Sequence, residues 1–131
     1  MIVEPTPHSP EIRFEPSSGR FLISGVSRPE DVRTFYYPVV DWLRKFLDEE
    51  IKTGKITFDE SNPLILDVTL KYFNSSSAKF LFDIFSELGN INEEGGKLKI
   101  RWFYESGDDD MLEAGEELSE IAEIPFEFIE T

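Results

Sequence analysis

The stretch LILDVTLKYFNSSSAKF, residues 64–80, places a strand pattern directly before a helix pattern. Apolar and polar residues alternate from Leu64 to Phe73, a pattern typical of a half-buried strand. The inward positions predicted by this alternation are Leu64, Leu66, Val68, Leu70 and Tyr72. Asn74 or Ser75 then supplies an N-cap, whose side chain accepts a hydrogen bond from a first-turn N–H group. The junction therefore predicts hydroxyl groups at an exposed helix start.

The helix that follows is amphipathic. Its apolar residues recur at helical spacing: Ala78, Leu81, Phe82, Phe85 and Leu88. Gly89 is placed as the residue that ends the helix, because glycine adopts the left-handed conformation common there.

Upstream of the junction, the pattern predicts a hairpin and then a helix. Residues 12–15 and 20–24 alternate around a Pro-Ser-Ser-Gly turn. Ser27 is predicted to cap a helix over about 29–52, and Pro38 predicts a kink or break within it. Residues 1–10 contain three prolines and are predicted to form a flexible N-terminal arm.

Downstream, residues 97–104 alternate as a further strand, residues 108–122 form an acidic helix, and residues 125–129 are a candidate short last strand. The predicted fold is α/β (α+β), with one mixed sheet of four to five strands in the order ββαβαβα(β). Helices are expected mainly on one face, with Lys71, Lys97, Lys99 and Arg101 on the other. Residues 11–131 are thus expected to form a single domain.

Composition excludes several classes of function. The chain has no cysteine, which excludes disulfides and thiolate chemistry. The formal net charge is −14, and residues 102–131 hold 11 of the 27 acidic residues and no Lys or Arg. Such a chain repels phosphate backbones and anionic lipids, so we expect neither nucleic acid nor membrane partners. With no leader-like start and no membrane-length apolar run, a cytoplasmic location is predicted.

The residues needed for catalysis are scarce. The single histidine, His8, lies in the predicted arm, and neither a nucleophile elbow nor a phosphate-binding loop is present. We therefore predict a protein that is not an enzyme and needs no cofactor. The alternative is a small metal-dependent enzyme that uses the acidic segment 108–116, because carboxylates bind Mg²⁺ and Ca²⁺. Acidic side chains at a helix start are also stabilised by the helix dipole alone, without any metal.

The Ser75-Ser76-Ser77 cluster has two interpretations. One serine that caps a helix is sufficient to explain it. Alternatively, a kinase modifies an outward hydroxyl there, adding roughly −1.5 to −2 charges that the helix dipole tolerates and a docked partner does not.

Two blocks of the sequence resemble the SiaC family of bacterial regulatory phosphoproteins. The first is Leu70 to Lys79, LKYFNSSSAK, and the second is Asp109 to Glu116, DDMLEAGE. Three further stretches agree with the family: residues 25–30, residues 35–38 with Trp42, and residues 102–105. The similarity spans nearly the whole chain.

The resemblance implies a fold and a regulatory mechanism. The fold would be similar to that of anti-sigma-factor antagonists (STAS-like domains). A cognate serine/threonine kinase would phosphorylate the protein, and a PP2C-type phosphatase would restore it. The unphosphorylated form would bind and activate a GGDEF diguanylate cyclase, and so promote cyclic di-GMP signalling and biofilm formation. An anti-sigma-factor antagonist acting on transcription, or an unmodified scaffold, remains open.

The resemblance also implies the site. The family usually has threonine directly after the asparagine, and Ser75 holds that position here, with Ser76 as a possible substitute. The switch surface is predicted to comprise Tyr72, Asn74, Ser76, Ser77 and Lys79. Lys79 lies one turn beyond Ser75, where its ammonium group is expected to pair with the phosphate.

Overall fold

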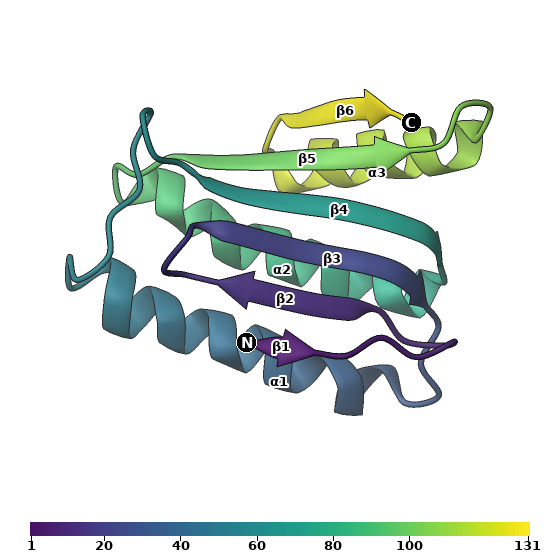
Figure 1. The fold of residues 1–131 in the computed structure, drawn as a ribbon, viewed down its shortest axis with the longest axis horizontal. Coiled ribbons are helices and arrows are strands. Elements are labelled where there is room, and N and C mark those ends of the chain that lie inside the picture. Colours follow the sequence, from purple (N-terminus) through teal and green to yellow (C-terminus); the bar gives the residue numbers. More distant parts are fainter.

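The structure is a computed structural model that describes residues 1–131. Six strands form one sheet, and three α-helices lie against one of its faces (Figure 1). The strands are β1 (Ile2–Val3), β2 (Glu11–Glu15), β3 (Arg20–Ser27), β4 (Leu64–Phe73), β5 (Leu98–Tyr104) and β6 (Phe126–Glu130). The helices are α1 (Val32–Phe46), α2 (Ser75–Glu93) and α3 (Asp109–Ala122), and a π-helical turn, η1 (Leu47–Ile51), extends α1. The mixed α/β class is confirmed, but the prediction of four to five strands was wrong.

The strands lie in the sheet in the same order as in the chain. β1, β2 and β3 pair antiparallel, whereas β3, β4, β5 and β6 pair parallel. Each parallel connection contains one helix. Because such crossovers share one hand and each moves to the next strand in the same direction, all three helices lie on the same face. The starts of α1, α2 and α3 therefore all lie at the carboxyl edge of the parallel strands (Figure 1).

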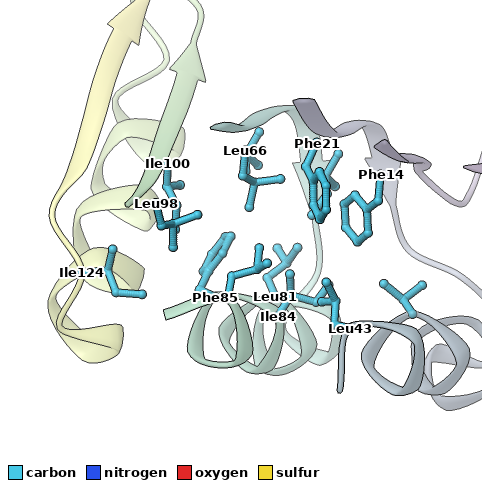
Figure 2. Close-up of a cluster of buried hydrophobic side chains, with 14 of the residues drawn as sticks. Phe14, Phe21, Leu43, Leu66, Leu81, Ile84, Phe85, Leu98, Ile100 and Ile124 are labelled. Carbon is cyan, nitrogen blue, oxygen red and sulfur yellow. The ribbon is translucent and has the colours of Figure 1, made fainter. Parts of the chain in front are cut away.

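The core lies between the sheet and the helices. Figure 2 shows strand residues such as Phe14, Phe21 and Leu66 meeting helix residues such as Leu81 and Phe85. These positions follow the strand alternation and the helical stripe predicted from the sequence. The opposite face has no helix over it, and there Arg101 donates to both carboxylate oxygens of Asp67 at 2.6 and 2.7 Å.

The first ten residues, which the sequence predicted as a flexible N-terminal arm, contain a short strand. Ile2 and Val3 pair with Arg13 and Ile12 as β1. The N-terminal ammonium group donates to the Phe14 carbonyl oxygen at 2.8 Å. The strand was missed because two residues are too few for an alternation. It is held by backbone pairing with β2 and by the partly buried side chains of Met1 and Val3, which pack against the core.

The limits of two helices also differ from those predicted. The N-cap of α1 is Asp31, whose carboxylate accepts from the N–H groups of Arg33 and Thr34, and not Ser27 as predicted. The helix continues through Pro38 without the predicted break, and its irregular part is η1. α2 continues past Gly89, where a Cβ atom would lie 3.0 Å from Ile124 Cδ1, so Gly89 permits close packing instead of ending the helix.

Candidate functional site

The candidate site is the junction between β4 and α2. In the pairing of β3 with β4, Gly25 is opposite Leu70 and Val26 is opposite Tyr72, so Lys71 is an extra residue in β4. Such a bulge reverses the alternation that follows it. Tyr72 is consequently 50% exposed, and Phe73 turns inward to meet Trp102 with ring centroids 6.0 Å apart. The predicted inward position of Tyr72 was wrong, because the alternation alone does not reveal a bulge.

Asn74 caps α2. Its backbone is extended, and its side-chain oxygen accepts a hydrogen bond from the Ser77 N–H at 2.9 Å. The predicted choice between Asn74 and Ser75 is thereby resolved. Ser75 and Ser76 form the first turn with exposed side chains, and their N–H groups precede the first intrahelical bond, from Ala78 to the Asn74 carbonyl. An acceptor at this surface therefore meets unused N–H groups at the positive end of the helix dipole.

Ser77 has a different environment from its two neighbours. It is fully buried, and its hydroxyl donates to the carbonyl oxygen of Ser27 at 3.1 Å. Ser27 Oγ donates to Ser77 Oγ at 2.8 Å and lies 2.5 Å from the Tyr36 hydroxyl. Burial raises the pKa of Tyr36, which keeps this cluster neutral. Ser77 is therefore a structural residue that joins β3, α1 and α2, and the prediction that it belongs to an exposed switch surface requires correction.

A sequence signal for Ser77 exists. The residue precedes the buried Phe80 and Leu81 by three and four positions, which places it on the apolar stripe of α2.

Lys79 lies on the exposed side of α2, one turn after Ser75. Its ammonium group pairs with Asp83 at 2.9 Å and lies 4.8 Å from the centre of the Phe80 ring. The ring of Tyr37 from α1, 57% exposed, meets the same Phe80 ring edge-on. Sequence reasoning missed Tyr37, because the contact depends on how α1 packs beside α2. These residues line a groove of about 330 Å³ between the two helices.

The acidic segment 108–116 has a structural role at its first residue. Asp108 caps α3 by accepting from the Met111 N–H at 3.1 Å. Nowhere in the structure do three His, Asp or Glu side chains gather closely enough to hold a metal ion. No helix has the length and apolarity required to cross a membrane.

These features define a small mixed α/β domain with an exposed, hydroxyl-bearing helix start at the carboxyl edge of its sheet. The protein belongs to the SiaC family of regulatory phosphoproteins, whose family model matches residues 3–131. An uncharacterized protein of Pseudomonas aeruginosa strain UCBPP-PA14 is 31% identical over 121 residues, which are 92% of this chain and 88% of that protein.

Solved structures of SiaC from Pseudomonas aeruginosa share the fold. The crystal structure of the diguanylate cyclase SiaD in complex with its activator SiaC contains a similar chain, with a TM-score of 0.82 and 28% identity. The match covers 100% of this chain and 99% of that one. Apo-SiaC matches with a TM-score of 0.78 and 29% identity, over 98% of this chain and 97% of that one.

Proposed function

We propose that this protein is a non-catalytic regulatory phosphoprotein that binds a GGDEF diguanylate cyclase and is switched by reversible phosphorylation of Ser75. A cognate kinase adds the phosphate, and a PP2C-type phosphatase removes it. The observation that carries the proposal is the exposed Ser75 hydroxyl directly after the Asn74 cap, in a chain whose family is described as regulatory phosphoproteins. The similarity to the SiaC chain that is complexed with SiaD supports the choice of partner.

The switch follows from the charge of the phosphate. Unmodified, the start of α2 presents neutral hydroxyls and free N–H groups that a partner can cover. A phosphate on Ser75 brings roughly −1.5 to −2 charges, which the helix dipole stabilises within the protein. The same group must be dehydrated or excluded before a partner docks. The modified form therefore keeps its fold and loses its partner.

The test is a binding titration of the cyclase with three forms of the protein: unmodified, phosphorylated on Ser75, and Ser75→Thr. Phosphorylation is expected to weaken binding on the order of a hundredfold, which corresponds to about 3 kcal/mol. Ser75→Thr restores the usual family residue and should bind like the unmodified protein. A fourth form, phosphorylated on the possible substitute Ser76, shows whether charge on either exposed serine of this turn blocks docking.

Equal affinities of the Ser75-phosphorylated and unmodified forms would refute the switch. If neither form binds the cyclase and the unmodified form instead binds an anti-sigma factor, the switch acts on transcription, as in the resemblance to anti-sigma-factor antagonists.

Lys79 is expected to hold the phosphate. It now pairs with Asp83, and a phosphate one turn away competes for its ammonium group with a larger negative charge. Lys79→Ala should therefore raise the second pKa of phosphoserine 75 above its value in the otherwise unchanged protein, as measured by ³¹P NMR titration. Lys45→Ala, an exposed lysine on α1, is the control and should leave that pKa unchanged. Identical titrations for the two variants would show that Lys79 does not contact the phosphate.

A further inference from the structure

β4 and β5 separate toward their carboxyl ends. Their pairing runs from Leu64 opposite Leu98 to Val68 opposite Trp102 and then stops. β4 continues to Phe73 beside β3 alone, and β5 continues to Tyr104 beside β6 alone. Figure 1 shows β4 bending away from β5 at this end of the sheet. The extra residue Lys71 lies in the bent part, and bulges bend the strand that contains them.

The separation leaves a hollow of about 250 Å³ within the sheet. One wall is Thr69, Leu70 and Lys71 from β4. The other residues around it are Phe103, Tyr104, Glu105, Asp108 and Thr131. Phe73 packs edge-on against Trp102 between the two strands. The hollow therefore lies beside an edge of β4 whose backbone groups have no neighbouring strand with which to form hydrogen bonds.

The charge around the hollow is acidic. Glu105 and Asp108 line it, and the exposed Asp109 and Asp110 follow directly in the chain. Lys71 is the one basic residue in the lining, and it forms no ion pair of 4.0 Å or less. A segment that enters the hollow thus meets more negative than positive side chains, which favours a basic occupant.

We propose that the part of β4 from Thr69 to Phe73 is a docking edge for an extended, basic segment of a partner protein. The segment adds a strand beside β4 through backbone hydrogen bonds, and it places a lysine or arginine in the hollow against Glu105 and Asp108. Strand addition of this kind takes its affinity from the backbone and its specificity from alternate side chains. The proposal does not depend on phosphorylation of Ser75.

Backbone pairing is tested with a short blocked peptide of alternating valine and lysine. Its binding to the ¹⁵N-labelled protein is followed by amide chemical shifts. The changes are expected to centre on the amides of residues 69–73 and 103–105. The same peptide with alternate nitrogens methylated cannot form the strand bonds and should bind at least about tenfold more weakly.

The charge requirement is tested with Glu105→Gln and Asp108→Asn together, since asparagine still caps α3. This double variant should bind the peptide several-fold more weakly. Glu117→Gln with Glu120→Gln removes the same charge from exposed residues of α3 that neither line the hollow nor adjoin its lining in the chain, and this variant should bind normally. Three results would overturn the proposal: shifts centred on either outer edge of the sheet, β1 or β6, equal binding of the methylated and unmethylated peptides, or no shifts at millimolar peptide.

Discussion

Replacing Gly115 by alanine is expected to lower the free energy of unfolding by about 3 kcal/mol. A Cβ atom at this position would lie 2.5 Å from Trp102 Nε1 and 2.6 Å from both Cδ1 and Cε2. The indole ring cannot move aside easily, because it is fully buried and its N–H donates to the Met111 carbonyl oxygen at 3.0 Å. It also stacks on Phe126 with centroids 6.0 Å apart. Urea unfolding followed by circular dichroism measures the loss.

Two further variants make the Gly115 experiment decisive. Glu116→Ala, at the next and exposed position of α3, should change stability by less than about 0.5 kcal/mol. Trp102→Leu is destabilising alone, but it removes the atoms that the new methyl group would strike. Combined with Gly115→Ala, it should show a favourable coupling of at least about 1 kcal/mol in a double-mutant cycle. Equal stabilities of Gly115→Ala and Glu116→Ala would show that the helix does not need glycine there.

Local patterns predicted most of the elements. Strands β2 to β5 and the stripe of α2 were correct because one face of each is buried, and burial imposes a period of two on strands and 3.6 on helices. The helix limits were less accurate, since they depend on tertiary contacts. Gly89 is a glycine because Ile124 lies against it, not because the helix ends there. Asp31 caps α1 because Ser27, the predicted cap, is the last residue of β3 and is bonded to Tyr36.

The candidate site was predictable only in part. A cap at Asn74 or Ser75 and an outward hydroxyl at the helix start follow from the order of residues, because a strand that leads directly into a helix needs a capping side chain. The choice of Asn74 as the cap comes from the structure. The outward turn of Tyr72 does not follow, since it depends on the bulge at Lys71 relative to β3. The separation of β4 from β5 was likewise invisible in the sequence, because each strand continues its own alternation where the pairing between them stops.

Ser77→Asp is expected to destabilise the protein by about 3–5 kcal/mol, a large fraction of the stability of a typical domain. The site is fully buried, and its nearest polar groups are the neutral hydroxyls of Ser27 and Tyr36 and the Ser27 carbonyl oxygen. No cation is among them, so the carboxylate is held there without a counterion. Burial raises its pKa in the folded state above the unfolded value of about 3.9. The part of the destabilisation that comes from the charge is therefore complete above the raised folded pKa. It disappears below about pH 4, where the carboxyl group is neutral in both states.

Urea unfolding at pH 7 and pH 4 distinguishes charge from size at this position. Ser77→Asn has nearly the same shape as Ser77→Asp without the charge, so its deficit should be smaller at pH 7 and nearly independent of pH. Ser75→Asp, two residues earlier and exposed at the same helix start, should stay within about 0.5 kcal/mol of the unsubstituted protein. If Ser77→Asp is as stable as Ser75→Asp at pH 7, the buried hydroxyl cluster does not persist in solution. If Ser77→Asp is destabilised as expected, its loss of partner binding reports the lower stability of the fold. Only the effect of charge at Ser75 then tests the switch.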